Sequence, residues 1–219
     1  MNKAQQHLRP VIALLGGTFD PIHFGHTLPA QETALWLGAE QLHLIPAHIP
    51  PHKAGTHASA QQRADMVALV CNNNPIFSLD SRELKRNQAS FTLDTLHELN
   101  AEHQAVDFYF IMGMDSLLSF TSWHKWQEIL SLCNIVVNIR PGYSHQALTE
   151  QLPQTLSQRL VDDLSQLKAQ RCGQIILHEC QAVDISSTEI RAKIKAGLPY
   201  RHYLPDAVYH YIEQHKLYR

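Results

Sequence analysis

The chain has 219 residues, of which 44% are hydrophobic and 17% are charged, an ordinary composition for a protein that buries one core. The formal net charge of -2 excludes a general electrostatic attraction for nucleic acid, so phosphate recognition must come from a local site. Fifteen histidines are many for this length, and six of them fall in the segment from His23 to His57. That clustering suggests a local function near the start of the chain.

The first residues and the cysteines indicate where the protein works. The opening segment is polar, and the apolar stretch from Val11 to Leu15 is too short for a signal-peptide core or a membrane span. The four cysteines occur singly in or beside apolar runs, without a CxxC pair, which favours reduced core residues over disulfides or a zinc knuckle. We therefore expect a cytoplasmic protein without a membrane partner.

Apolar runs rich in β-formers alternate with stretches of helical spacing or helix-forming composition. The predicted strands are Val11–Gly16, Gln41–Pro46, Ile76–Leu79, Val106–Met112, Asn134–Ile139 and Gln174–Leu177. The predicted helices are Gly25–Leu37, Ala58–Asn72, Thr92–Asn100, Trp123–Ser131, Gln154–Gln170, Ser187–Ala196 and Pro205–His215. This alternation predicts an α/β fold with a doubly wound parallel sheet, in which ligands bind at the carboxyl ends of the strands.

No internal repeat, low-complexity tract or linker rich in glycine and serine marks a domain boundary. We therefore expect one domain over residues 1–219, with a helical C-terminal portion from about residue 185. Arg140–Tyr143 and Ala47–Thr56 are predicted as loops.

A glycine-rich turn follows the first predicted strand, where the chain reads GGTFDPIHFGH from Gly16 to His26 before a helical stretch. Glycines let the backbone approach a ligand closely, and a helix N-terminus offers unpaired N–H groups to an anion. His23 and His26, at that helix start, would add donors for the same phosphates. A plain turn with capping histidines and a zinc-binding histidine pair are the alternatives, but the HExxH arrangement is absent.

A second segment with phosphate-binding residue types follows the second predicted strand, where Pro46–Lys53 reads PAHIPPHK. Its consecutive prolines stiffen a loop that ends in the cation of Lys53. Taken alone, this segment is more typical of a surface loop with a solvated lysine.

A third segment, Asp184–Arg191, reads DISSTEIR and contains the SxxE pattern of a capping box. A well-capped helix is the simple interpretation. Ser187, Thr188 and Arg191 would, however, place two hydroxyls and a guanidinium at a helix N-terminus, where an anion binds favourably. Two such helix starts in one chain are the strongest sign of a phosphate site.

Two segments between these phosphate-binding motifs could hold a second substrate. In the first, Glu83–Leu96, Ser90 or Thr92 could cap a helix. In the second, the strand Val106–Met112 leads into a turn and then into Trp123, which is by default a core residue.

The string GTFDPIHxGH resembles the signature of the nucleotidyltransferase superfamily with the (H/T)xGH motif, in its nicotinate mononucleotide adenylyltransferase form. PPHK, ISSTEIR and the terminal YLPxxVxxYI are similar to further motifs, so the resemblance extends from Leu15 to Tyr218. The departures are His48 for a common Asn, Gln88 for Gly, Phe91 for Tyr, and His124 in place of the usual aromatic. The resemblance leaves the role of His124 open.

The resemblance implies direct in-line transfer of the adenylyl group of ATP to nicotinate mononucleotide, without a covalent enzyme intermediate. Because the acceptor is already a phosphate anion, no strong general base is needed, and the barrier lies in bringing two anions together. The implied catalytic residues are His23, His26, Lys53 and Arg191. The implied ATP-binding residues are Gly16, Gly17, Thr18, Phe19, His23, His26, Lys53, Ser187, Thr188 and Arg191. The implied acceptor-binding residues are Thr92, Asp115 and Trp123. Mg²⁺ is expected to enter with ATP, and no protein metal site and no nucleic-acid partner are expected.

Three other interpretations stay open on the sequence. The acceptor could be nicotinamide mononucleotide or phosphopantetheine. Nicotinate and nicotinamide differ only by a carboxylate in place of a carboxamide, and the sequence does not show the donor geometry that would distinguish them. A catalytically silent nucleotide sensor could keep the fold, because fold does not establish activity. A histidine-rich metal hydrolase would instead hold tightly bound zinc. The sequence also leaves the oligomeric state open, a homo-oligomer included.

Overall fold

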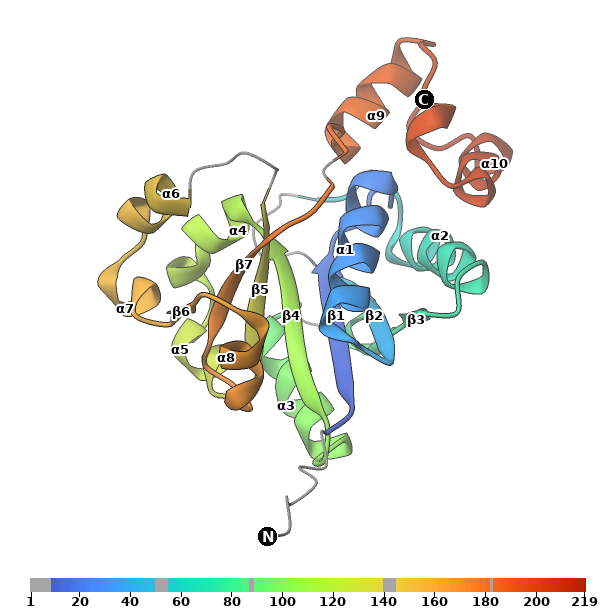
Figure 1. Ribbon diagram of the computed structural model, residues 1–219. Coiled ribbons are helices and arrows are strands. Elements are labelled where there is room, and N and C mark those ends of the chain that lie inside the picture. Colours follow the sequence, from blue (N-terminus) through green and yellow to red (C-terminus); the bar gives the residue numbers. More distant parts are fainter. Residues whose placement is uncertain (1–8, 50–54, 87–88, 140–144, 182) are drawn as a thin grey trace, which may run out of the picture.

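The computed structural model describes residues 9–49, 55–86, 89–139, 145–181 and 183–219. A seven-stranded sheet forms its centre, with every strand pair parallel and the order β3-β2-β1-β4-β5-β7-β6 (Figure 1). The strands are β1 (Val11–Gly17), β2 (Gln41–Pro46), β3 (Phe77–Leu79), β4 (Asp107–Gly113), β5 (Asn134–Ile139), β6 (Leu160–Val161) and β7 (Ile175–Glu179). This confirms the predicted doubly wound α/β fold, whose strand order reverses between β1 and β4.

The central strands β1, β4 and β5 are mostly apolar because helices cover both faces of the sheet. Successive residues of β1 point to opposite faces, so that Ala13 packs in one buried cluster while Ile12 and Leu14 pack in the other. All three are at most 9% exposed. The register aligns Ile12 with Gln41 of β2 and with Phe108 of β4, which brings the carboxyl ends of these strands to one edge.

One face of the sheet is covered by the helices α1, α2 and α8, and α9 and α10 add to the same buried cluster. Their bounds are α1 (Phe24–Leu37), α2 (Ala60–Asn72), α8 (Leu164–Ala169), α9 (Ser187–Lys195) and α10 (Asp206–His215). Figure 1 places α9 and α10 beyond the carboxyl ends of the strands, close to the start of α1. The C-terminal helices therefore stand where ligands bind in this fold class.

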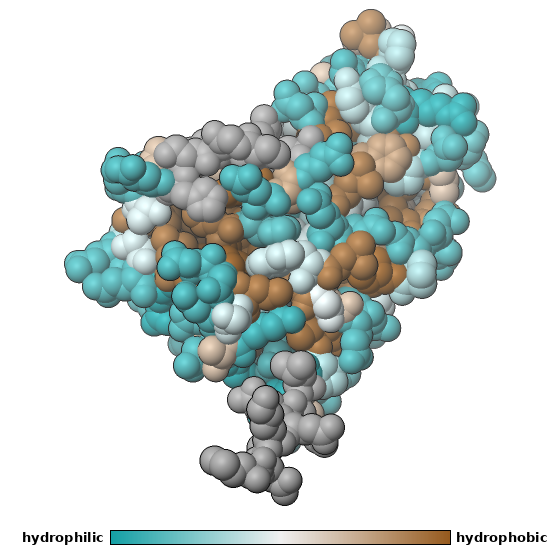
Figure 2. All heavy atoms as spheres, in the orientation of Figure 1, coloured by the Kyte–Doolittle hydropathy of each residue, from teal (hydrophilic) through white to brown (hydrophobic). Residues whose placement is uncertain are grey.

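The other face is covered by α3 (Thr92–Glu102), α4 (Met114–Leu118), α5 (Trp126–Leu130), α6 (His145–Gln151) and α7 (Gln154–Ser157). Short 3₁₀ helices are η1 (Arg82–Lys85), η2 (Phe120–Ser122) and η3 (Arg201–Tyr203). The view in Figure 2 shows hydrophobic residues over the lower part of α1, which carries the exposed side chains of Leu28 and Leu35. Among the described residues, no helix is long and apolar enough to cross a membrane.

Local sequence signals explain several helix ends. The Ser59 hydroxyl accepts a hydrogen bond from the N–H of Gln62 at 3.2 Å and caps α2. The predicted capping box of Ser186 and Glu189 is confirmed at the start of α9, where the N–H of Glu189 donates to the Ser186 hydroxyl at 3.1 Å. Gly38 ends α1 in the left-handed conformation, with a φ of 66°.

The predicted helix Gln154–Gln170 is wrong, because the structure divides this segment into α7, β6 and α8. Leu160 pairs with Ile175 of β7, so the sheet has an additional edge strand that the residue composition of this segment does not predict. Asp163 then begins a new helix by accepting a hydrogen bond from the N–H of Gln166 at 2.9 Å.

Two other expectations are also corrected. The helix predicted from Trp123 begins only at Trp126, because Lys125 adopts a left-handed φ of 49° in front of it.

Neither Ser90 nor Thr92 caps α3. The N-cap residue of this helix is Phe91, and no side chain makes a capping hydrogen bond there. The Ser90 hydroxyl instead accepts a hydrogen bond from the N–H of His48 at 2.9 Å.

Candidate active site

The histidine pair lies at the start of α1, after the loop that leaves β1. His23 is the N-cap residue, and its N–H donates to Nδ1 of His26 at 3.3 Å. The two rings lie with centroids 3.8 Å apart. The His23 side chain is buried, and burial lowers its pKa to about 4, so this ring is neutral at pH 7. Its Nδ1 has no hydrogen-bond partner among the residues that the structure describes.

Gly25 is required between the two histidines by close packing. A Cβ at this position would lie 2.9 Å from ring atoms of His23 and 3.2 Å from the carbonyl oxygen of Ile185. The first loop and the segment before α9 therefore meet at this point. Phe19, predicted to bind ATP, is 1% exposed, and its ring packs edge-on against His26 at 5.2 Å.

The ISSTEIR segment contacts the first loop directly. Arg191 donates from Nη1 to the carbonyl oxygen of Asp20 at 2.7 Å, and the Ser187 hydroxyl donates to the carbonyl oxygen of Pro21 at 2.9 Å. Arg191 also donates from Nη2 to the Thr188 hydroxyl at 3.2 Å. The structure thus brings together two predicted phosphate-binding motifs that are far apart in the sequence.

Asp20 is a buried acceptor at the centre of this arrangement, and sequence reasoning did not single it out. Its carboxylate accepts hydrogen bonds from the N–H groups of His57 at 2.8 Å and Ala58 at 3.1 Å, and from the Tyr218 hydroxyl at 2.9 Å. Burial raises the pKa of Asp20, but these bonds and the charge of Arg191 outweigh burial and lower it. The carboxylate is therefore ionised at neutral pH.

Arg63 is a second buried residue that sequence reasoning missed. Its side chain is 0% exposed and donates to the carbonyl oxygens of Thr18 at 2.7 Å, Ala47 at 2.6 Å and His48 at 3.0 Å. One guanidinium therefore ties the loop after β1 to the loop after β2. The available signal was its place in α2, four residues before the buried Val67 on the apolar face.

A cavity of about 230 Å³ lies at the carboxyl end of β1 and contains two of the predicted acceptor residues, Thr92 and Trp123. The Trp123 ring is held edge-on by Phe110 at 6.1 Å and by Phe120 at 5.4 Å. The full lining is Gly16, Gly17, Thr18, Ala47, Glu83, Ser90, Phe91, Thr92, Phe110, Ser116, Trp123, His124 and Ile129. Gly16, Gly17 and Thr18, predicted for ATP, thus face the same cavity as the acceptor residues.

A second, larger cavity of about 650 Å³ contains His26 and Gly25 at the start of α1 and Ile185 before α9. Asp115, predicted to bind the acceptor, lines this cavity and does not line the smaller one. Ser116 lines both, so the two cavities adjoin at the start of α4.

The smaller cavity has a buried acid in its wall, Glu83, which the sequence did not mark as a site residue. Glu83 is 7% exposed and accepts a hydrogen bond from the Thr95 hydroxyl at 2.7 Å. Burial raises the pKa of Glu83, and this effect outweighs the hydrogen bonds from Thr95 and Ser90, which lower it.

His48, which departs from the family pattern, donates from Nδ1 to the carbonyl oxygen of Arg86 at 2.5 Å. The ring of His124, the other departure in this area, packs against Phe91 at 4.6 Å.

Lys53 lies outside the described residues, so its predicted role has no structural counterpart here. Within the described ranges, no three His, Cys, Asp or Glu side chains form a group that could hold a metal ion.

A family model described as cytidylyltransferase-like matches residues 14–193. A protein of Aeromonas hydrophila, named a probable nicotinate-nucleotide adenylyltransferase, is 44% identical over 212 residues, which cover 97% of this chain and 99% of the relative. A Yersinia enterocolitica protein of the same name is 45% identical over 212 residues and 96% of each chain.

Solved structures with the same fold include Plasmodium falciparum nicotinic acid mononucleotide adenylyltransferase, complexed with NaAD in one structure and with APC in another. Each has a TM-score of 0.71 and 18% identity, over 95% of this chain and 97% of that chain. At this identity the likeness shows the fold alone. The full-length relatives above 40% identity confirm what the motifs indicated: the chain belongs to the nicotinate-nucleotide adenylyltransferase family, within the cytidylyltransferase-like proteins.

Proposed function

We propose that this chain transfers the adenylyl group of ATP to nicotinate mononucleotide, forming nicotinate adenine dinucleotide and pyrophosphate for NAD biosynthesis. A phosphate oxygen of the acceptor forms a bond to the α-phosphorus, and the bond from that phosphorus to the bridging oxygen of the β-phosphate breaks. The observation that carries the proposal is the junction of two cavities at Ser116, with His26 in one wall and Trp123 in the other.

ATP is proposed to occupy the larger cavity, with its phosphates at the starts of α1 and α9. Nδ1 of His26 accepts a hydrogen bond from the backbone N–H of His23, so the neutral ring of His26 carries its proton on Nε2. This Nε2–H group is proposed to donate to a phosphate oxygen. Arg191, Ser187 and Thr188 supply further donors, and Lys53 is proposed to add a cation. These donors stabilise the charge of the transferring group.

Mg²⁺ is proposed to arrive with ATP and to stay on its phosphate oxygens and water. The side chains of the site fit this arrangement, because the carboxylate of Asp20 in the first loop is buried and already accepts three hydrogen bonds. Mg²⁺ commonly binds through substrate phosphates and keeps several waters. When bound, it neutralises charge on the phosphates and on the leaving pyrophosphate.

The acceptor is proposed to bind in the smaller cavity, with its pyridine ring against Trp123 and within reach of Thr92. A flat aromatic surface suits a pyridine ring. Gly16, Gly17 and Thr18 then line the path between the two substrates, where backbone N–H groups can approach a phosphate closely. Asp115 is proposed to contact the acceptor nucleotide from the larger cavity, beside Ser116.

We also propose that residues 1–219 form one domain, with a helical C-terminal portion from about residue 185, and that it works in the cytoplasm without a nucleic-acid or membrane partner. The two buried clusters that share the central sheet support a single unit.

The test is incubation of the purified chain with ATP, Mg²⁺ and nicotinate mononucleotide, followed by mass analysis of the products. One dinucleotide and one pyrophosphate should form per ATP consumed, and His26→Ala should form little of either. Pyrophosphate without a dinucleotide, or neither product from the folded wild-type chain, would contradict the proposal.

A further inference from the structure

The last residues of the chain contact the phosphate loop through Asp20. The Tyr218 hydroxyl donates to Oδ1 of Asp20 at 2.9 Å, across 198 residues of sequence. The carbonyl oxygens of Asp20 and of the next residue, Pro21, accept the hydrogen bonds from Arg191 and Ser187. The tail and the ISSTEIR segment therefore hold the same two-residue stretch, one through the side chain and the other through the backbone.

The backbone of the tail is bent to make this contact. Lys216 and Tyr218 both adopt left-handed φ values, of 51° and 65°, which residues with a Cβ rarely adopt. Such conformations persist only where surrounding contacts hold them, and they concentrate at functional positions. The bend turns the chain back after α10 and brings Tyr218 to Asp20.

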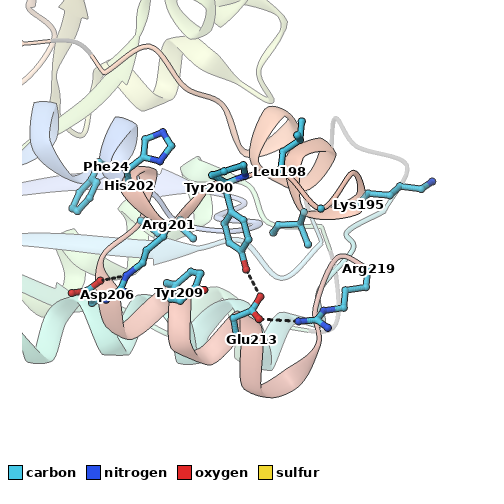
Figure 3. Close-up of a pocket in the computed structure, with 14 residues that line it drawn as sticks. Phe24, Lys195, Leu198, Tyr200, Arg201, His202, Asp206, Tyr209, Glu213 and Arg219 are labelled. Carbon is cyan, nitrogen blue, oxygen red and sulfur yellow. Dashed lines mark hydrogen bonds and ion pairs between the residues drawn. The ribbon is translucent and has the colours of Figure 1, made fainter.

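Contacts on α10 fix the tail from its other side. Arg219 donates from Nη2 to Oε2 of Glu213 at 2.9 Å, and the Tyr200 hydroxyl donates to the other oxygen of Glu213 (Figure 3). The N–H of Leu217 donates to the carbonyl oxygen of Ile212 at 3.1 Å. The residues on both sides of Tyr218 are thus anchored to α10, whose own core residues Val208 and Ile212 are 0% exposed.

The charges around the Tyr218 hydroxyl belong to the phosphate site. Besides Asp20, the charges that act on this phenol are those of Arg191 and Arg63. Arg191 is the proposed phosphate ligand, and Arg63 holds the carbonyl oxygen of Thr18 in the same loop. Loss of the phenol would therefore remove a hydrogen bond from a carboxylate whose charge interacts with both Arg191 and Arg63.

We propose that Tyr218 is a positioning residue for the ATP phosphates, acting through Asp20 to hold the Thr18–Ile22 loop against Arg191. This inference rests on the proposed function for the identity of the ligand. It assigns a role in nucleotide binding to the end of the chain, far in sequence from both phosphate motifs.

The test compares Tyr218→Phe with Tyr211→Phe. The Tyr211 hydroxyl also donates to a carboxylate, Oδ2 of Asp65 at 2.8 Å, but this bond joins α10 to α2 and does not involve the loop that contains Asp20. Both variants lose one phenol–carboxylate hydrogen bond, so a general loss of stability affects both. Binding of α,β-methylene ATP with Mg²⁺ is measured by calorimetry without acceptor, and KM is then measured for each substrate.

Tyr218→Phe should raise the Kd of the ATP analogue and the KM for ATP roughly tenfold, because small displacements of a positioned group have large effects. The KM for nicotinate mononucleotide should stay within about twofold, and Tyr211→Phe should leave all three constants within the same range. Equal analogue affinity in Tyr218→Phe and Tyr211→Phe would overturn the positioning role.

If Tyr218→Phe does not fold, Arg219→Ala replaces it, because this variant loosens the tail and keeps the phenol. Weaker analogue binding in Arg219→Ala than in Tyr211→Phe supports the role, and unchanged binding overturns it. The calorimetric measurement of analogue binding does not depend on catalytic turnover. A wild-type chain that binds the analogue but forms no dinucleotide would refute the proposed function, while weaker binding in Tyr218→Phe would still support the positioning role.

Discussion

Arg191 and Asp20, 171 residues apart in sequence, are joined by a hydrogen bond of 2.7 Å from the guanidinium to the backbone carbonyl oxygen. This bond fixes the start of α9 against the loop that begins α1. Two helix N-termini that each favour an anion are thereby held at one place.

Arg191→Ala should lower kcat by about 10²- to 10³-fold, the range found when one donor to a transition-state oxyanion is removed. Arg191→Lys should retain more of the wild-type kcat than Arg191→Ala but less than all of it. An ammonium group lacks the planar pair of nitrogens with which the guanidinium donates to both Asp20 and Thr188. Steady-state kinetics checks both variants. Arg201→Ala, an exposed arginine paired with Asp206, is the control and should keep full turnover. Full turnover in a folded Arg191→Ala variant would remove Arg191 from the site.

His26→Ala should reduce turnover far more than stability. The side chain is a proposed phosphate donor, and it lies in the wall of an open cavity, where truncation leaves little unfilled core. We expect a loss of about 10²-fold in kcat with a change below about 1 kcal/mol in the free energy of unfolding. Turnover and denaturant unfolding, measured on one preparation, test this. A folded variant with wild-type turnover would rule out the role.

His23 should make the protein less stable in acid. Its folded pKa of about 4 lies below the ordinary value of 6.5, so the unfolded state takes up a proton first as the pH falls. The contribution of neutral His23 is fully present above pH 6.5 and is lost as the pH falls towards 4. Between pH 7.5 and 4.5 the wild type should lose roughly 2 to 3 kcal/mol more than His23→Asn. The same loss in both proteins would show that His23 is not buried in its neutral form.

Trp123→Ala should raise the KM for the acceptor about tenfold, the order expected for one aromatic stacking contact, and leave the KM for ATP nearly unchanged. Trp126→Ala is a matched control, because Trp126 also packs against Phe120 but does not line the smaller cavity. Steady-state kinetics on both substrates separates the two tryptophans. An unchanged acceptor KM in Trp123→Ala would remove this residue from the ring site.

Arg63→Leu should destabilise the fold by about 3 to 5 kcal/mol, because three carbonyl oxygens would lose their buried donor. Arg171→Ala removes an exposed arginine that makes one hydrogen bond to a backbone carbonyl, that of Gln104, and should change stability by less than about 0.5 kcal/mol. Urea unfolding of both variants provides the comparison. Equal unfolding midpoints would show that Arg63 does not brace the loops.

The sheet was predictable because β1, β4 and β5 are short, mostly apolar runs, as is typical of strands that are buried on both faces. The segment Gln154–Gln170 was not predictable. Its edge strand β6 has only two residues, Leu160 and Val161, whose pairing with β7 depends on tertiary contacts.

The phosphate motifs were readable because glycines, histidines and an SxxE pattern stand together over a few residues. Asp20 and Arg63 were not identified, since their partners lie 15 to 198 residues away in sequence. The position of Asp115 also escaped prediction. Whether a residue at the carboxyl end of β4 faces one cavity or the other depends on how α4 packs, which no local pattern encodes.

The most direct measurement is pyrophosphate release from ATP and Mg²⁺ with nicotinate mononucleotide, nicotinamide mononucleotide and phosphopantetheine compared side by side. The value of kcat/KM for nicotinate mononucleotide should exceed that for each of the other two acceptors. Preference for another acceptor would contradict the assignment of the Trp123 cavity, and no release with any of the three would favour a nucleotide sensor over an enzyme.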